Sequence, residues 1–208
     1  MNPLLIRRRG MMQAGGGTPL PYDSKISAIY SASNNTSSYI ELPYTPNIDT
    51  EIIIRAYLII RNNNGYFGSR LDPLRFCATT FSNGSQVAFA MTDNNWPSTR
   101  LSYSVNHFYT FFAKNGQYGW EGNTYTSPTL NSFSTTEKFQ LFRIRMLGSN
   151  YYYSAMGVSN ITIKENGSVV QSYYSVRVGT TPYLYEEISG NMYGNMGGGT
   201  LYAGNDIQ

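Results

Sequence analysis

The sequence predicts an all-β protein, a two-sheet antiparallel jelly-roll sandwich, preceded by an extended N-terminal arm. Short segments rich in β-branched and aromatic residues alternate with turns built from Asn, Ser and Gly along most of the chain. No amphipathic helical pattern extends beyond a turn or two. The chain has 208 residues, a length that suits one undivided sandwich.

The composition supports a folded β domain with a neutral polar surface. Charged residues make up 13% of the chain, well below the roughly 25% of an average soluble protein. Aromatic residues reach 15%, with 19 tyrosines, ten phenylalanines and two tryptophans. Asn, Ser, Thr and Gly therefore supply most of the polarity, which favours strands and turns over helices. The high aromatic content argues against intrinsic disorder.

Residues 1–24 form a segment distinct from the domain predicted over residues 25–208. The segment contains a short apolar tip, three consecutive arginines and Gly15–Gly17, followed by Pro19 and Pro21, and no periodicity of 2 or 3.6 persists in it. These arginines are three of the fifteen basic residues, and the other twelve are matched by twelve acids. The domain itself is thus neutral overall, and we expect no nucleic-acid-binding face.

We expect the arm to anchor the protein to a partner subunit. The candidate anchors are Leu4, Leu5 and Ile6, through apolar contacts, and Arg7, Arg8 and Arg9, through acidic or carbonyl groups of the partner. The charges follow the apolar tip, whereas a secretory signal has the opposite order. No run of about 18 apolar residues predicts a membrane span. We therefore expect a protein that is made and assembled in a cytoplasm.

Within residues 25–208 the strongest strands are recognisable individually. Residues 50–61 are rich in β-branched residues, and 107–114 precede an Asn-Gly turn. Residues 159–165 and 168–174 flank Asn166-Gly167 and predict a tight hairpin. Residues 138–147 alternate as one amphipathic strand. Gln140, Phe142, Ile144 and Met146 are expected on one face, and Phe139, Leu141, Arg143 and Arg145 on the other.

The sequence favours a protein that is not an enzyme and has no metal or cofactor. Asp49 and Glu51 have the i, i+2 spacing of two carboxylates on one strand face, but solvated charges are common at a strand end. His107 begins a strand without a nucleophile motif. Cys77 is the one cysteine and suits a buried small side chain. The Asp93-Asn94-Asn95 group is better explained as a polar turn than as a calcium site.

Aromatic residues are the best candidates for a binding site. Trp96, Trp120 and the triplet Tyr151, Tyr152 and Tyr153 can stack on sugar rings or pack against another subunit. The alternative for any one of them is ordinary core packing, because a sandwich of this size must bury many of its aromatic side chains. A neutral surface rich in Tyr, Asn and Ser is more typical of contact surfaces than of catalytic clefts.

The C-terminal third resembles the end of concanavalin A-like (laminin-G-like) jelly rolls, which occur in gut Bacteroidales and their tailed phages. The resemblance is carried by the hairpin over residues 161–170, the Leu184-Tyr185 pair, Ser189-Gly190 and Tyr193-Gly194-Asn195. Residues 39–43 are similar to the family's opening strand. The chain departs from the pattern at Glu186-Glu187, and it lacks the Glu-x-Asp-x-x-Glu catalytic strand of the family's glucanases.

This resemblance and the arm together favour a virion structural protein of a tailed phage. We expect a capsid decoration or head-fibre protein, a homotrimer bound to capsid or other virion subunits through its arm and displaying the jelly roll. The alternative is a non-catalytic carbohydrate-binding module that recognises host glycans. A glycoside hydrolase is a third, less favoured, interpretation because the expected catalytic strand is missing.

Overall fold

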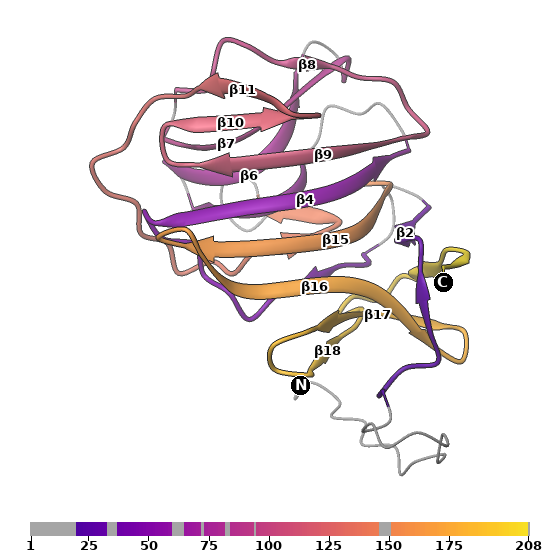
Figure 1. The fold of residues 1–208 in the computed structure, drawn as a ribbon. Coiled ribbons are helices and arrows are strands. Elements are labelled where there is room, and N and C mark those ends of the chain that lie inside the picture. The colour runs from indigo at the N-terminus through magenta and orange to yellow at the C-terminus, as the bar shows by residue number, and fades with distance from the viewer. Residues whose placement is uncertain are drawn as a thin grey trace.

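In a computed structural model of the chain, two antiparallel sheets pack face to face and the described residues contain no helix (Figure 1). The predicted all-β jelly-roll sandwich is therefore confirmed. The described part of the chain accordingly holds no helix long and apolar enough to cross a membrane. The structure describes residues 20–32, 37–59, 65–71, 73–81, 84–93, 95–145 and 151–207.

The larger sheet, sheet A, has antiparallel neighbours throughout. Its main path runs β11 (Asn123–Thr126), β10 (Gln117–Trp120), β9 (His107–Lys114), β4 (Thr50–Leu58), β15 (Met156–Glu165), β16 (Ser168–Val178), β1 (Ser24–Ile26) and β20 (Asp206–Ile207). Off this path lie β17 (Thr181–Glu186), which pairs with β16, its neighbour β18 (Met192–Tyr193), and β2 (Ile29–Ser31), which bridges β15 and β19 (Tyr202–Ala203).

The smaller sheet, sheet B, covers one face of sheet A. Its order is β3 (Ile40–Glu41), β12 (Gln140–Leu141), β5 (Gly65–Leu71), β6 (Leu74–Phe81), β7 (Gln86–Thr92) and β8 (Leu101–Ser102). A separate two-stranded ribbon consists of β13 (Arg143–Arg145) and β14 (Tyr151–Tyr153). A Cβ atom on Gly65 would overlap the Ile144 side chain, so the ribbon lies directly on β5.

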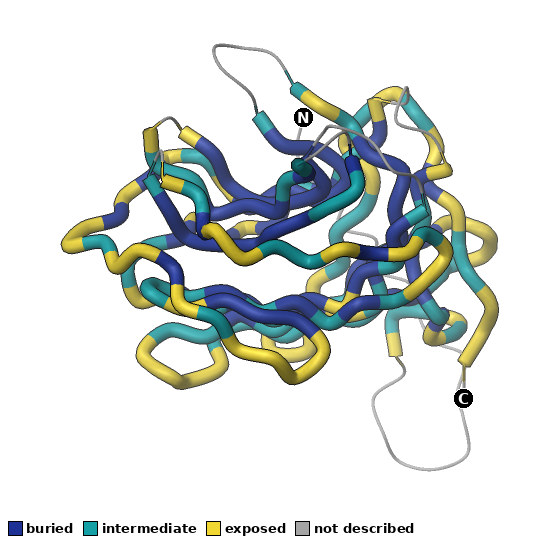
Figure 2. The backbone as a smooth tube through the Cα atoms, turned by 90° about the horizontal axis from the view of Figure 1, so that it is seen from above, coloured by how far each residue is buried: buried dark blue, intermediate teal, exposed yellow. Residues whose placement is uncertain are grey.

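The core forms between the two sheets. Alternation along β4 turns Ile52, Ile54 and Ala56 inward, and each is fully buried. From sheet B the Phe67 ring meets Phe111 of sheet A at 6.0 Å between ring centroids. Seen from above, buried residues run along the middle of both layers and exposed residues gather at the loops (Figure 2). The alternating pattern of the sequence thus selects which strand faces become the interior.

The expected single strand over 138–147 is wrong, because the chain breaks at Phe142. This residue is buried and has a φ of 67°, a left-handed conformation that ends β12 before β13 begins. Its backbone carbonyl accepts a hydrogen bond from the N–H of Ser154 at 2.8 Å. The break moves the chain from sheet B onto the ribbon. Ile144 therefore does not share a continuous strand with Gln140, and it is buried against Gly65 of β5.

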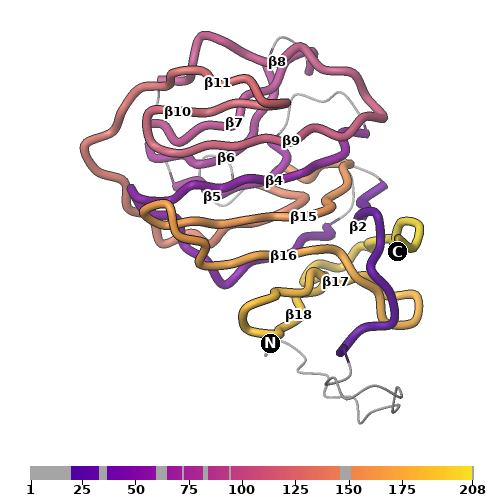
Figure 3. The backbone as a smooth tube through the Cα atoms, viewed as in Figure 1, coloured from indigo at the N-terminus to yellow at the C-terminus, as the bar shows by residue number. Residues whose placement is uncertain are grey.

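The two ends of the described chain lie side by side at one corner of sheet A (Figure 3). β1 pairs with both β16 and β20, and Tyr22, just before β1, contacts the rings of Tyr174 and Tyr185. The six predicted anchors, Leu4 to Arg9, lie outside the described residues.

Candidate functional site

The face of sheet B that points away from sheet A, its outer face, has small side chains at its centre. In register, Gly68 of β5 lies opposite Cys77 of β6, and Cys77 lies opposite Ala90 of β7. Directly opposite residues of antiparallel strands share a face. The larger Phe67, one position from Gly68, points into the core instead. The centre of the outer face is therefore lined by small side chains, and Cys77 and Ala90 are fully buried there.

One side of this face is covered by the β13–β14 ribbon and the other by residues 95–100. Thr92 ends β7 on the outer face, and its hydroxyl donates a hydrogen bond to the Asn95 carbonyl at 2.6 Å. Asp93 Oδ1 accepts the Asn95 N–H at 2.8 Å, which closes a tight Asx turn. Together these bonds fold the segment back over the outer face and direct Trp96 onto β6.

Trp96 is half-buried over β6 and has contacts on both sides. Its ring meets the Phe81 ring edge-on at 5.5 Å, and the guanidinium carbon of Arg75 lies 5.9 Å from its ring centroid. Arg75 and Phe81 begin and end the outward-facing set of β6. Trp96 is consequently held in place by its neighbours while part of its ring stays open to solvent.

Arg100 completes this group, which we call the Trp96 site: Arg75, Phe81, Trp96 and Arg100. The guanidinium carbon of Arg100 lies 3.7 Å above the Phe81 ring centroid, a cation–π contact. Arg100 is placed by the neighbouring Thr99, whose carbonyl accepts the Tyr118 hydroxyl at 2.6 Å. Burial raises the pKa of Tyr118, and the positive charge of Arg100 is a smaller, opposing influence on it.

The ribbon side of the outer face carries another arginine between aromatic rings. The Arg143 guanidinium carbon lies 3.1 Å from the Tyr39 ring centroid and 4.2 Å from that of Tyr151. Its Nε donates to the Gln140 side-chain oxygen at 2.9 Å. Gln140 in turn donates to Glu41 at 3.0 Å. Gln140 lies opposite Gly68 on β5, so its hydrogen bond connects Arg143 to the outer face of sheet B.

The sequence-predicted aromatic candidates separate into surface and core. Trp96 belongs to the Trp96 site, and Tyr152 is 40% exposed on the ribbon. Tyr151 packs on Arg143, and Tyr153 lies opposite Arg143 in the ribbon. Trp120 is 6% exposed and stacks on Tyr125 at 4.7 Å between centroids, so it has little ring surface to offer a sugar. Trp120 is therefore a core residue, Tyr152 is exposed, and Trp96, Tyr151 and Tyr153 are half-buried.

The arginines were missed by sequence reasoning, which treated the domain as neutral. Arg75 of β6 faces Arg70 of β5 directly across the outer face. The alternation of β6 was the available signal, since Arg75, Cys77, Thr79 and Phe81 form one face of the strand. Without knowledge of which face is outward, that pattern does not single out a site.

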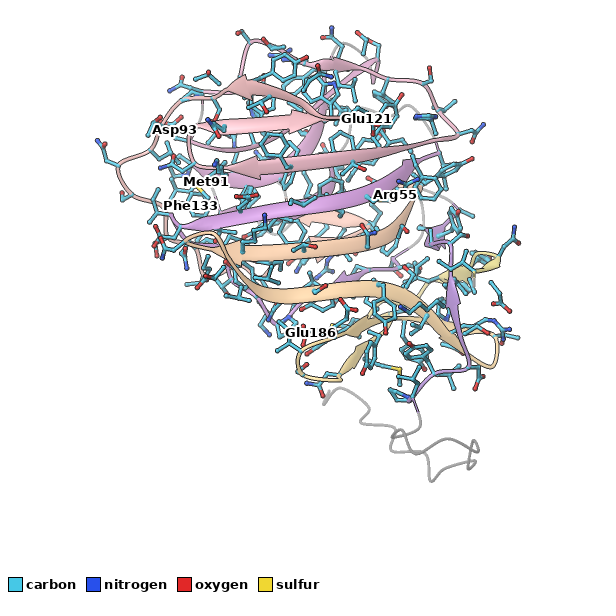
Figure 4. The ribbon with its side chains drawn as sticks, viewed as in Figure 1. Arg55, Met91, Asp93, Glu121, Phe133 and Glu186 are labelled. Atoms are coloured by element: carbon cyan, nitrogen blue, oxygen red, sulfur yellow. The ribbon has the colours of Figure 1, made fainter. Side chains whose placement is uncertain are left out.

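Carboxylates do not gather at the Trp96 site in the part of the chain that the structure describes. No group of three or more metal-ligating side chains occurs among these residues. Asp93 and Glu121 lie at opposite ends of the sandwich (Figure 4), and Glu121 accepts the Thr110 N–H at 2.7 Å. Glu51, half of the spaced pair, makes an ion pair with Lys164 at 3.3 Å. The geometry is therefore suited to stacking and hydrogen bonding.

Solved structures share this fold at low sequence identity. A heptameric SAP-like pentraxin from Limulus polyphemus aligns with a TM-score of 0.53 and 8% identity over 88% of this chain and 97% of that chain. A candidate carbohydrate-binding protein from Bacteroides ovatus aligns with a TM-score of 0.54 and 12% identity over 88% of this chain and 62% of that chain. No family model matches the chain, and no curated protein matches it.

These similarities define the class of fold, a lectin-like two-sheet jelly roll, and confirm the fold that the sequence resemblance implied. The resemblance also implied a relation to proteins of particular organisms, which these similarities do not test. The expected relation to proteins of Bacteroidales and their phages stays a prediction. Because identities near 10% show the fold alone, function has to be argued from the Trp96 site.

Proposed function

We propose that the protein is a non-catalytic carbohydrate-binding module and that the Trp96 site is its sugar-binding surface. The observation that carries the proposal is the half-buried Trp96, whose ring contacts Arg75 and Phe81 over the outer face of sheet B. Sugars present C–H faces that stack on aromatic rings and hydroxyls that take up planar hydrogen-bond donors such as guanidinium groups. The Trp96 site combines both. The similar folds of a pentraxin and a candidate carbohydrate-binding protein agree with this assignment.

A glycan-binding experiment with two matched variants tests the proposal. Full-length protein is screened on a broad polysaccharide panel, and the best ligand is titrated against Trp96→Ala and Tyr202→Ala. Tyr202 is an aromatic residue 53% exposed on the outer face of sheet A. Removing a central aromatic anchor costs about 2 kcal/mol or more, so Trp96→Ala should weaken binding by roughly thirtyfold or more. Tyr202→Ala should bind as the wild type does.

Two outcomes would overturn the assignment. If the folded wild-type protein binds no polysaccharide of the panel, the proposed binding function is wrong. If wild type and Trp96→Ala bind with equal affinity, the ligand does not bind at the Trp96 site. Tyr152→Ala then tests the other aromatic candidate. Thermal unfolding of each variant establishes that the folded state is retained. Release of reducing sugar by the purified wild type would contradict the non-catalytic part of the proposal.

The virion function stays a prediction alongside this one, because it depends on the arm. A capsid decoration or head-fibre protein can display a sugar-binding domain, so the two proposals are compatible. Deleting residues 1–24 tests the arm: particles that incorporate residues 25–208 as well as the full chain would contradict it. Light scattering of the purified full chain measures the oligomeric state, for which we predict a trimer.

A further inference from the structure

The outer face of sheet B gathers positive charge although the domain as a whole is neutral. Arg70 and Arg75 lie directly opposite one another on adjacent strands, an arrangement that is unfavourable for like charges. Both make further contacts within the chain. Arg100 lies on the same face, above the Phe81 ring. The nearby Asp93 carboxylate accepts a hydrogen bond within its own turn.

Arg100 has a buried donor atom without a hydrogen-bond acceptor. Its Nε is buried and has no acceptor among the described residues, and no ion pair joins Arg100 to a carboxylate there. A guanidinium has five N–H donors in one plane and no acceptor. The guanidinium carbon lies 3.7 Å from the Phe81 ring centroid, so this ring holds the guanidinium group in place. A buried donor without an acceptor is costly. An oxyanion that displaced the groups covering Nε would remove that cost.

Four other basic side chains among the described residues form ion pairs with carboxylates. Lys138 pairs with Glu41 at 3.4 Å, Lys164 with Glu51 at 3.3 Å and Arg145 with Glu137. Arg177 forms a two-pronged pair with Asp206 at 2.6 and 2.7 Å. Arg100 lies close to Trp96, because both side chains contact the Phe81 ring. This coincidence of an anion-seeking group and a stacking ring is what suggests the ligand.

We propose that the Trp96 site selects acidic polysaccharides, with the sugar ring stacked on Trp96 and its carboxylate or sulfate bound by Arg100 with help from Arg75. The proposal rests on the carbohydrate-binding function above and names the chemical class of its ligand. Two neighbouring oxygens of one anionic group match the guanidinium edge, and both the planar carboxylate of a uronate and the tetrahedral sulfate of a sulfate ester provide such a pair. A neutral sugar would fill the stacking position alone.

Paired polysaccharides that differ in charge alone test this selectivity with the full chain. The carboxylate pair is polygalacturonate and its fully methyl-esterified form, and the sulfate pair is dextran sulfate and dextran. The wild type should bind the acidic member of at least one pair tenfold or more tightly than the neutral member. The pair that shows the larger ratio identifies carboxylate or sulfate as the bound group.

Three variants locate the selectivity. Arg100→Gln should lower the ratio of acidic to neutral affinity at least fivefold, whereas Arg100→Lys, which keeps the charge without the planar donor edge, should give an intermediate ratio. Trp96→Ala should weaken binding to both members. Lys164→Gln removes a positive charge from sheet A and should leave the ratio unchanged. Thermal unfolding of each variant shows that the domain is folded.

The outcomes separate the two proposals. No binding to any of the four polysaccharides, or to a broader panel, overturns the carbohydrate-binding function itself. Equal binding to both members of each pair overturns the selectivity and leaves that function in place. An acidic preference that Arg100→Gln does not change, or equal affinity for single-stranded DNA of similar charge, assigns the effect to general attraction and overturns the role of Arg100.

Discussion

Glu186 holds a turn of sheet A together through a buried carboxylate. It is 2% exposed at the end of β17, on the strand pair below β16 (Figure 4). Its Oε1 accepts the backbone N–H groups of Ser172 and Ile188, both at 3.1 Å, and its Oε2 accepts that of Ser189 at 2.5 Å. Burial by itself raises the pKa of this carboxyl, but the hydrogen bonds outweigh it and the pKa is lowered.

Substituting Glu186→Gln keeps the shape and replaces one acceptor oxygen with a donor amide. In either orientation the new NH₂ group faces at least one backbone N–H that the carboxylate had satisfied. Losing charge-assisted bonds and leaving a buried donor unpaired costs about 2–4 kcal/mol. For a domain of this size we expect the melting temperature at pH 7 to fall by roughly 5–15 °C. Differential scanning calorimetry measures it.

The pH dependence gives the refuting result. Because the pKa of Glu186 is lower in the folded state than in the unfolded state, its stabilisation is present above the unfolded value. It is lost as the pH falls through the folded value. The difference between wild type and Glu186→Gln should therefore shrink in acid. The adjacent Glu187→Gln, which changes an exposed carboxylate bound by the Ser172 hydroxyl, should have little effect. Equal melting temperatures for wild type and Glu186→Gln at pH 7, or a difference that persists unchanged into acid, would refute the reasoning.

Two further stability predictions concern the outer face of sheet B. Gly68 has a φ of 138°, and a Cβ there would lie 2.3 Å from the Cys77 Cβ. Gly68→Ala should destabilise by about 2–5 kcal/mol in urea unfolding. Gly167→Asn, at an open turn with a φ of 80°, should cost less than about 1 kcal/mol. Arg143→Lys keeps the charge but loses the plane stacked between two tyrosines, and should cost about 1–3 kcal/mol. An Arg143→Lys protein as stable as wild type would contradict that packing role.

Elements with a complete local signal were predicted from the sequence. The Asn166-Gly167 turn has φ values of 49° and 80°, the left-handed pair that a two-residue hairpin of this type requires. The strand predicted over 107–114 is β9 with the same bounds. In both cases the residues that specify the structure are adjacent in sequence. The prediction therefore needs no knowledge of the partner strand beyond the turn.

The break at Phe142 had no such local signal. A left-handed φ is unfavourable for a bulky residue, and residues 138–147 alternate as a continuous strand would. The conformation follows from tertiary packing: β12 joins sheet B, while Ile144 on β13 packs over Gly65 of β5. The small residue that makes room is about 80 positions earlier in the chain, so a local pattern cannot reveal it.

The candidate site shows the same limit for function. Trp96 and Trp120 were equal candidates in the sequence, since each stands beside turn-forming residues. Trp120 is on β10 and its alternation turns it toward Tyr118 and Tyr125, whereas the Asp93 turn places Trp96 on the outer face. The same holds for charge. Twelve acids and twelve bases make the domain neutral overall, but the fold decides which face each charge occupies, so one face can still be positive. Arg100 acquires its proposed role because Phe81, nineteen positions earlier, places an aromatic ring beneath it. A ligand of this domain is therefore specified by which face each alternating residue occupies, and composition alone does not contain that information.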